Sequence, residues 1–561
     1  MTKLSEGTLS LWAKKDSLDG KEKWLPLIQH LVDAENVINW LYQHFLNDSQ
    51  RSLLEDTLTI EETEKIVKFI GFFHDIGKAT PAFQTKQSYI HDEDLDQDLF
   101  EKLIDSGFTK LDEYIPSLRS KSPHAEAGEA ILERNGLNDS VGAIIGGHHG
   151  KPLSFAPTDQ IDNFTSNYYQ SDHDRPIQLN WINAQKELIN FGLASVGYQS
   201  LDQVPVVTEP VAVLLEGLLI MADWLSSSEY LECRPLFPLV PLNCGFNEID
   251  SQRRFQRGIL NWIQNDQWEP QNVRDIAKHY QHRWGFSPRV VQEKISESIA
   301  KTEDPGMIVI EAPMGIGKTE IALMAVEQLA ARTGRNGLYM GLPTQATTNA
   351  MFSRIKSWLT SISKDSSASL DIKLMHGKAQ FNPEYKDIPE ASNISDDSTS
   401  NAVVVNSWFS GKKSILAEFT VGTIDQLLRM SLKQKHLFLR HLGLSGKIVI
   451  IDEVHAYDVY MSSYLTRAIE WLGAYHVPVI ALSATLPKEK RRSLLKAYAR
   501  GKFGKSRLIA SRTWEDNQSY PLLTMLDGQQ LIQNDDFPDN SSTRVKVVKF
   551  HADDQETISK I

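Results

Sequence analysis

The chain has 561 residues, 41% of them hydrophobic, and a net charge of −13. This length allows several domains at about 150 residues each. Its two cysteines, Cys233 and Cys244, form no CxxC pattern, which excludes a cysteine zinc site and a disulfide framework and indicates a reducing, cytoplasmic setting. The acidic balance argues against a nucleic-acid partner at face value, but a net charge averages over all faces and does not exclude a basic groove.

The sequence gives no sign of a membrane segment. Residues 1–16 mix charged side chains with no long apolar core, so we expect no signal peptide here. The longest apolar run, residues 211–225, is interrupted by Glu216 and Asp223 and is too short and too charged to span a bilayer. We expect this run to form a buried helix that delivers Asp223 to a metal site, and we expect no membrane partner.

Residues 1–232 predict an all-α domain, because apolar residues recur at helical spacing, for example over residues 24–46 and 60–73. Histidines and aspartates are spread along it, with FFHDIGK at residues 72–78 as the central stretch. Imidazole and carboxylate donors together favour borderline divalent transition metals, and an adjacent His-Asp pair can place one carboxylate between two ions. The pattern predicts a metal-dependent phosphodiesterase. Its candidate ligands are His30, His74, Asp75, His124, His148, His149 and Asp223.

A connecting region follows at residues 233–294. Residues 234–241 (RPLFPLVP) are proline-spaced, which predicts an extended linker, and helical patterns continue to about residue 290. From residue 295 to 525, short β-branched strands alternate with helices, which predicts an α/β domain with a parallel sheet covered on both faces.

A phosphate-binding loop lies between a predicted strand and an amphipathic helix in this second domain. Gly315 and Gly317 allow backbone N–H groups to turn toward phosphate oxygens. Lys318 can reach the β- and γ-phosphates, and Thr319 can hold magnesium. Ala312 replaces the first glycine of the strict pattern, but the strand before the loop and the helix after it give the expected context.

The apolar strand predicted at residues 447–451 ends in two carboxylates. Asp452 would hold magnesium through water, and Glu453 would polarise the water that attacks the γ-phosphate. Isolated Asp-Glu pairs are usually solvated. At the end of an apolar strand that follows a phosphate loop, this pair predicts an Mg-ATP site.

Three further segments, GLPTQ at residues 341–345, TIDQ at 423–426 and SAT at 483–485, each follow a β-rich run. Without the flanking motifs each would be an ordinary turn or helix cap. With them, the chain resembles superfamily 2 DExH helicases, whose first RecA-like domain carries these elements in this order. The resemblance implies that Gln292 reads adenine. It also implies DNA-binding and coupling roles for Thr344, Gln345, Thr423, Ser483 and Thr485.

A His-Asp nuclease joined to such a motor resembles the CRISPR-associated nuclease-helicase of type I systems, which the Cascade surveillance complex recruits with its guide RNA and target R-loop. The resemblance implies a single-stranded DNA endonuclease and 3′-to-5′ exonuclease coupled to ATP-dependent 3′-to-5′ unwinding. By it, His74 and Asp75 are catalytic, and Asp75 bridges two ions of iron, manganese, cobalt or nickel. Lys78 would contact the scissile phosphate, the alternative being a solvated lysine.

Residues 526–561 are expected to begin a truncated second RecA-like domain, with one strand at 544–550. No residue can be assigned to the arginine finger that such a domain supplies, so weak ATPase activity is expected. Two other functions stay open. One is a phosphohydrolase acting on nucleotides with the ATP-binding half as a regulator, and the other is a non-catalytic remnant that binds DNA or Cascade, which the complete ligand set disfavours.

Lysine and arginine residues cluster over residues 488–507. They predict either contacts to phosphates or the solvated face of a helix whose apolar side is Leu494, Leu495 and Tyr498.

Overall fold

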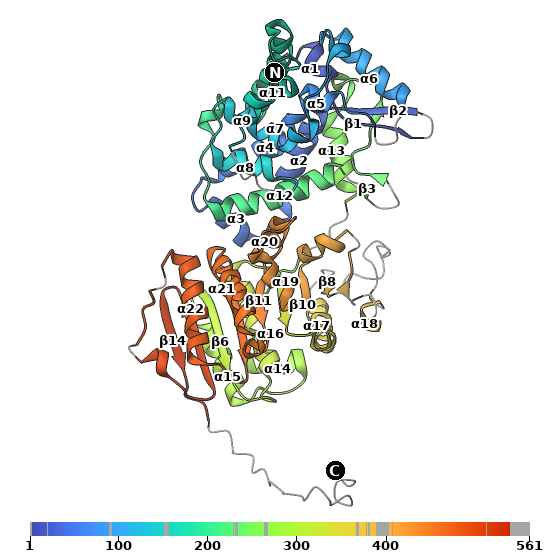
Figure 1. The fold of residues 1–561 in the computed structure, drawn as a ribbon. Helices are drawn as coiled ribbons and strands as arrows, with labels where there is room; N and C mark the ends of the chain where they lie inside the picture. Colours follow the sequence, from blue (N-terminus) through green and yellow to red (C-terminus); the bar gives the residue numbers. More distant parts are fainter. Residues whose placement is uncertain are drawn as a thin grey trace, which may run out of the picture.

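The computed structural model has a helical domain stacked on a sheet domain (Figure 1). This arrangement confirms the predicted succession of a helical domain and a RecA-like α/β domain. The residues that the structure describes are 3–18, 21–88, 92–150, 156–227, 229–230, 234–262, 267–365, 370–376, 379, 382–386, 388, 403–406, 408–505, 507–511 and 513–538. Cys233, the insertion at residues 391–401 and the strand expected at 544–550 lie outside them.

The helical domain is built around one apolar core that reaches into the sheet domain. Its long helix α12 (Glu209–Ser227) is apolar enough to cross a membrane by length and composition, yet 67% of its most apolar stretch is buried in the molecule. It is therefore the core helix that the sequence predicts. The helices of this domain are α1 (Glu6–Ser10), α2 (Leu27–His44), α3 (Asp48–Glu55), α4 (Ile60–Phe73), α5 (Pro81–Gln84), α6 (Glu93–Asp105), α7 (His124–Arg134), α8 (Asp139–Gly147), α9 (Asp159–Asn163), α10 (Thr165–Tyr169), α11 (Arg175–Val196) and α12 (Glu209–Ser227).

A small antiparallel sheet in this domain was not predicted. Strand β1 (Trp12–Leu18) pairs with β2 (Lys21–Pro26), and β2 also pairs with β5 (Val240–Pro241). The helix expected over residues 24–46 therefore begins at Leu27, because Pro26 ends the strand before it. A second short pair joins β3 (Glu229–Tyr230) to β4 (Arg234–Pro235).

The proline-spaced segment is not a free linker. Strand β5 extends the N-terminal sheet, and the next helix, α13 (Ser251–Leu260), packs on α2. Two hydrogen bonds fix α13 there: Arg254 Nε donates to Asp33 Oδ2 at 2.8 Å, and Ser251 Oγ donates to Gln29 Oε1 at 2.8 Å. Much of the predicted connector thus belongs to the helical domain.

The RecA-like domain has a nine-stranded sheet in the order β14-β13-β6-β12-β11-β7-β10-β8-β9. Most neighbours are parallel, but β13 pairs with β6, and with β14, in antiparallel register. The strands are β6 (Pro305–Glu311), β7 (Leu338–Leu342), β8 (Leu370–Met375), β9 (Val403–Val404), β10 (Phe419–Thr423), β11 (Ile448–Ile451), β12 (Val479–Ser483), β13 (Leu522–Asp527) and β14 (Gln530–Asn534).

The hairpin of β13 and β14 corrects the predicted start of a second RecA-like domain at residue 526. Leu526 pairs with Leu531 inside this hairpin, whose first strand extends the sheet beside β6. Residues 526–534 therefore belong to the first RecA-like domain. Pairing between β13 and a strand more than two hundred residues earlier leaves no trace in local sequence patterns.

Helices cover both faces of the sheet, as the alternating pattern predicts. Helix α22 carries the basic cluster and buries Leu494, Leu495 and Tyr498, so the interpretation as a helix with an apolar side is confirmed. The helices are α14 (Ile276–Trp284), α15 (Val290–Ala300), α16 (Lys318–Thr333), α17 (Gln345–Asp365), α18 (Pro383–Lys386), α19 (Ile424–Leu428), α20 (Leu437–Ser445), α21 (Val459–Ala474) and α22 (Lys488–Phe503).

The two domains meet where α12 packs on α20. A Cβ on Gly217 would lie 2.7 Å from Phe438 O, so only glycine permits this approach. Side chains of α3 and its cap add hydrogen bonds: Asn47 Nδ2 donates to Gly446 O at 2.8 Å, and Gln50 Nε2 donates to Leu442 O at 2.9 Å. The interface is thus packed and hydrogen-bonded.

Candidate metal centre and nucleotide site

Separate helices bring the predicted metal ligands together. His30 lies in the first turns of α2, and His74 caps the end of α4 directly before Asp75. His124 begins α7, His148 caps α8, and Asp223 projects from α12. Five helices of one core thus position six of the seven predicted ligands, and the seventh, His149, lies exposed in the turn after α8.

The donors form two groups. Within each group, the ligand atoms lie within 4.8 Å of one another. The first donor group is His30, His74, Asp75 and Asp223. The second donor group is His124, His148 and His149. All the predicted ligands are therefore assembled.

Asp75 faces both groups with different oxygens. Its Oδ2 lies 2.7 Å from His30 Nε2 and 3.3 Å from His74 Nε2. Its Oδ1 lies 3.3 Å from His124 Nε2 and 3.6 Å from His148 Nε2. A carboxylate with one oxygen toward each donor group has the placement that a bridge between two cations requires.

The polar atoms at this site fit divalent cations. His74 Nε2, His148 Nε2 and Asp75 Oδ1 are buried and have no hydrogen-bond partner among the described residues. Buried polar atoms without partners are costly and rare in folded proteins. Imidazole and carboxylate donors suit transition metals, so the orphaned atoms and the donor chemistry agree.

Backbone carbonyls orient two of the rings. His74 Nδ1 donates to Gly71 O at 2.8 Å and His148 Nδ1 donates to Ile145 O at 2.7 Å, which turns both Nε2 atoms toward the site. The motif glycine has a separate role, since a Cβ on Gly77 would lie 1.9 Å from His124 O. Glycine at position 77 therefore lets α7 carry its histidine into the site.

The site concentrates negative charge. Burial alone would raise the pKa of Asp75, but Lys78 and His74 hold it well below its usual range, so the carboxylate is ionised. Burial opposes protonation of His74, yet Asp75 and Asp223 raise its pKa to about 9. Burial lowers the pKa of His148 to about 4. Such a field attracts cations. The His148 ring is unprotonated, whereas a cation that binds at His74 would displace the proton of that ring.

Lys78 is not the solvated lysine of the alternative interpretation. Its side chain is 8% exposed, and Nζ lies 2.6 Å from Asp75 Oδ2. A second lysine nearby, Lys14 on β1, was missed in the sequence, because nothing in the pattern of that strand links it to the motif. Burial and the charge of Lys78 lower the pKa of Lys14 to about 8, and Asp223 and Asp75 partly offset them.

The phosphate loop and the acidic pair line one cavity of about 680 Å³ together with Gln292. Gly315 and Gly317 adopt positive φ angles of 77° and 89°, as the loop requires. Lys318 Nζ donates to Ala312 O at 2.9 Å. All predicted nucleotide-binding residues lie here: Gln292, Gly315, Gly317, Lys318, Thr319, Asp452 and Glu453.

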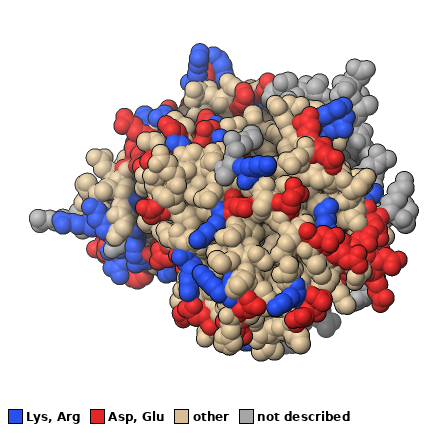
Figure 2. Space-filling model, turned by 90° about the horizontal axis from the view of Figure 1, so that it is seen from above, with Lys and Arg blue, Asp and Glu red and all other residues tan. Residues whose placement is uncertain are grey.

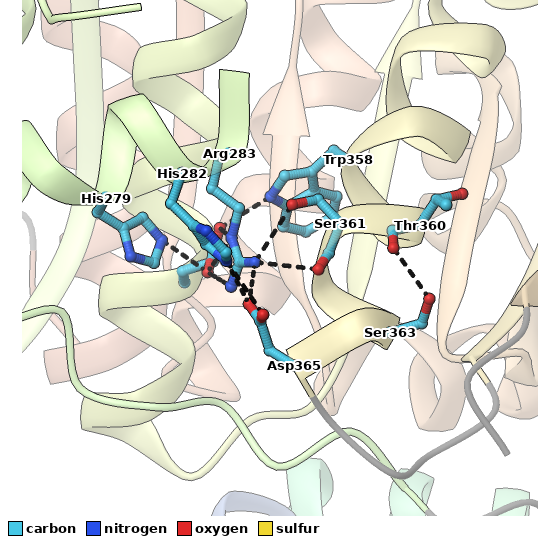
Figure 3. A network of polar contacts seen from close by, with 9 residues as sticks. His279, His282, Arg283, Trp358, Thr360, Ser361, Ser363 and Asp365 are labelled. Carbon is cyan, nitrogen blue, oxygen red and sulfur yellow. Dashed lines mark hydrogen bonds and ion pairs between the residues drawn. The ribbon is translucent and has the colours of Figure 1, made fainter. Parts of the chain in front are cut away.

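Two arginines in this cavity were not predicted. Arg354 of α17 donates to Thr319 Oγ1 at 3.1 Å, and Arg289 donates to Gly315 O at 2.7 Å. Single arginines carry no spacing signal, so only the fold reveals them. The loop that holds Arg289 is anchored by a polar network in which Arg283 of α14 bonds Glu327 of α16 at 2.9 Å and Asp365 of α17 (Figure 3).

A histidine connects the acidic pair to the SAT segment. His455 Nδ1 lies 3.2 Å from Glu453 Oε2 and 3.1 Å from Ser483 Oγ, which itself donates to Thr485 O at 2.6 Å. Glu453 has a positive φ of 50°, a strained conformation for a side-chain-bearing residue. Ser483 therefore contacts the nucleotide site rather than a DNA groove, in keeping with a coupling role.

The remaining predicted DNA contacts share a second cavity of about 390 Å³ at the carboxyl ends of β7 and β10. It contains Thr344, Gln345 and Thr423. His376 and Arg429 also line it and were not predicted. Hydroxyl, amide and guanidinium groups in one groove are typical partners of a sugar-phosphate backbone.

Known proteins match the chain over both domains. The family model for the Cas3 HD domain matches residues 12–231, and that for DEAD/DEAH box helicases matches residues 289–493. A CRISPR-associated nuclease/helicase Cas3 from Streptococcus thermophilus is 43% identical over 539 residues, which cover 93% of this chain and 57% of that protein.

Solved structures also match the fold of this chain. The crystal structure of T. fusca Cas3 superposes with a TM-score of 0.74 at 26% identity and covers 96% of this chain and 57% of that one. A chain of a CRISPR RNA-guided surveillance complex, pre-nicking, has a TM-score of 0.62 at 25% identity, with 94% and 54% coverage. The chain thus spans little more than half the length of the relatives it matches.

Proposed function

Because the chain belongs to the Cas3 family, we propose that it is a metal-dependent DNA nuclease joined to part of an ATP-driven DNA motor, acting in type I CRISPR interference. The nuclease would cut single-stranded DNA internally and as a 3′-to-5′ exonuclease. The motor would contribute to 3′-to-5′ unwinding. Since the chain covers 57% of the Streptococcus thermophilus relative, the proposal depends on the residues of the site rather than on the relative's name.

The observation that carries the proposal is the position of Asp75 between the two donor groups. Its two oxygens face different histidine sets, and buried ring nitrogens on both sides have no protein partner among the described residues. A single structural ion or a core histidine cluster would not need such an arrangement. Two cations that share a carboxylate are typical of phosphodiester hydrolysis.

The two ions, with iron, manganese, cobalt or nickel as candidates, supply an activated water and stabilise the leaving oxygen when they are bound. The first donor group would hold one ion and the second donor group the other. The backbone carbonyls that bond His74 and His148 keep these rings turned toward the site. Lys78, which is buried beside Asp75, would offer its ammonium group to the phosphate that is cut.

The RecA-like domain would bind Mg-ATP. Lys318 would reach the β- and γ-phosphates, Thr319 and Asp452 would hold magnesium, and Glu453 would orient the attacking water. Gln292, which lies in the same cavity, would read adenine. His455 joins Glu453 to Ser483, which offers a route by which the nucleotide state reaches the DNA-binding segments.

Single-stranded DNA and the Cascade complex with its guide RNA and R-loop are the proposed partners, and the cytoplasm is the proposed location. A match to a chain of an RNA-guided surveillance complex supports the partner. Sequence choice would then come from base pairing with the guide rather than from side chains that read bases.

The test is an anaerobic assay on circular single-stranded DNA with manganese, cobalt, nickel or iron, with and without ATP. We expect linear and then degraded DNA in the presence of metal alone, and no cleavage by His74→Ala. Hydrolysis of free nucleotides without DNA cleavage would favour a nucleotide phosphohydrolase. DNA binding without any hydrolysis would favour a non-catalytic remnant.

A further inference from the structure

We propose that the RecA-like domain supplies a phosphate-binding lysine to the rim of the nuclease site. Lys412 holds a backbone phosphate of the single strand next to the phosphate that is cut, and His436 positions Lys412. The inference rests on the proposed nuclease function and extends it to a site that is shared between the two domains.

His436 places the RecA-like domain directly beside the metal centre. Its ring meets that of Trp224 edge to face, with 5.3 Å between centroids, and Trp224 is the neighbour of Asp223. On the other side it lies against Gly150, the residue after His149, since a Cβ on Gly150 would be 2.9 Å from His436 N. His436 thus contacts Trp224, which follows Asp223 of the first donor group. It also contacts Gly150, which follows His149 of the second donor group.

The backbone at this contact is held in unusual conformations. His436 has a φ of +63° and Gly150 has a φ of +85°. A left-handed conformation at a residue other than glycine is strained and persists only where the surroundings impose it, most often at functional sites. The close approach also requires glycine at position 150, because any side chain would collide with the backbone of His436.

The histidine orients a lysine. Lys412 Nζ lies 2.8 Å from His436 Nε2, and because an ammonium group can only donate, Nε2 must be the acceptor. Burial and the charges of Lys412 and Lys435 lower the pKa of His436 to about 4, which keeps the ring neutral and able to accept. Lys412 itself is exposed, so its remaining N–H groups are available to a phosphate.

The same segment leads to the groove of the motor domain. Arg429 lines the groove with Thr344 and Thr423, and the chain runs from Arg429 to His436 over a distance of at most about 25 Å. Two further exposed lysines, Lys433 and Lys435, lie on this segment. Single-stranded DNA that leaves the groove toward the metal centre would follow the positive charges of Arg429, Lys433 and Lys435.

The top face of the helical domain is less suited to single-stranded DNA. On the top face of the helical domain, Figure 2 shows acidic and basic side chains interspersed over the described residues, with acidic ones gathered along one edge. A polyanion is repelled by such an edge and attracted to the lysines of residues 412–435. The charge distribution therefore favours entry to the nuclease from the side of the RecA-like domain.

The experiment measures cleavage of single-stranded DNA without ATP for wild type, Lys412→Ala, His436→Ala and His436→Gln, at several salt concentrations. Lys412→Ala should raise KM about ten-fold with kcat nearly unchanged, since it removes a charge-assisted hydrogen bond. It should also lower the slope of log KM against log salt by about 0.7, the value for one phosphate contact on a single strand. Lys488→Ala removes a lysine of α22 that pairs with Asp516 and should behave as wild type.

His436 is tested as a positioning residue. His436→Ala should raise KM by a smaller factor and leave the salt slope unchanged, because Lys412 keeps its charge. His436→Gln should restore KM, since the amide oxygen of glutamine can take the place of Nε2 and accept from Lys412. In a chain that already carries Lys412→Ala, neither change at 436 should add to the defect.

An unchanged KM and salt slope in Lys412→Ala, with wild-type cleavage intact, would overturn the inference and leave the nuclease proposal standing. If the wild type does not cut DNA, the proposed function fails. Fluorescence anisotropy with labelled single-stranded DNA then decides the inference separately, because equal affinity of wild type and Lys412→Ala would overturn it. Equal thermal midpoints of all variants exclude a folding defect.

Discussion

Asp75→Asn is expected to abolish DNA cleavage and to destabilise the helical domain, for two different physical reasons. Cleavage is lost because an amide cannot share a negative charge between the two donor groups. Stability is lost because Lys78, whose side chain is 8% exposed, loses the carboxylate 2.6 Å from its Nζ. Leaving a buried charge without its partner costs about 3–5 kcal/mol.

The magnitude can be read from thermal unfolding. For a domain of this size, 1 kcal/mol shifts the midpoint by about 2–4 °C, so Asp75→Asn should lower it by about 6 °C or more. Adding Lys78→Met removes the unpaired charge and keeps an apolar chain of similar length. The double variant should therefore recover most of the stability and none of the cleavage.

Both readouts have a matched control and a refuting result. Glu61→Gln removes a carboxylate from a pair with Lys65 on the exposed face of α4, so neither cleavage nor the midpoint should change appreciably. Metal-dependent cleavage by Asp75→Asn would refute the shared carboxylate. Equal destabilisation of the single and double variants would refute the argument from the ion pair.

Three further outcomes are expected. A chelator should abolish cleavage, and manganese, cobalt or nickel should restore it; persistence after exhaustive chelation would contradict a metal centre. Lys318→Ala should lose ATP binding, measured by calorimetry, yet cut circular single-stranded DNA as the wild type does, and a parallel loss of cleavage would contradict separate roles. Burial raises the pKa of Glu129 to about 8, above the usual value near 4.5. The folded state therefore binds more protons between about pH 4.5 and 8, and the stability present at low pH is lost as the pH rises through 8. Glu129→Gln should flatten this fall in thermal midpoint, and an unchanged pH profile would contradict the argument.

The clustering of the metal ligands could be predicted from the sequence because four of the seven ligands carry a local signal. His74 and Asp75 stand together at the end of an amphipathic helix, and His148 and His149 stand together after two glycines. Residues that pack against the ligands from distant segments carry no such local signal. Glu216, for example, looks like an interruption of an apolar run, yet its carboxyl fills the space beside Gly147, next to the ligands.

The phosphate loop and the strand before Asp452 were predictable for the same reason, since a buried parallel strand is a continuous apolar run. The edges of the fold were not. Pro26 converts the expected start of a helix into the end of strand β2, and the hairpin at residues 522–534 finds its place only through pairing with β6. Register between distant strands is decided by tertiary packing, which local periodicity does not record.

The separation of nuclease and nucleotide sites follows from how the domains are joined. Asp452 and the phosphate loop lie at the carboxyl ends of the strands, where open α/β sheets bind their ligands. The helical domain instead contacts the opposite side: Asn47 bonds Gly446, which precedes β11, and Asn336, which precedes β7. The length of a β-strand therefore separates the ATP cavity from the domain that holds Asp75. Nucleotide binding at one edge can move the DNA groove directly, but it reaches the metal ligands only through packed contacts such as α20 on α12. This geometry is the physical reason to expect cleavage of a naked single strand without ATP.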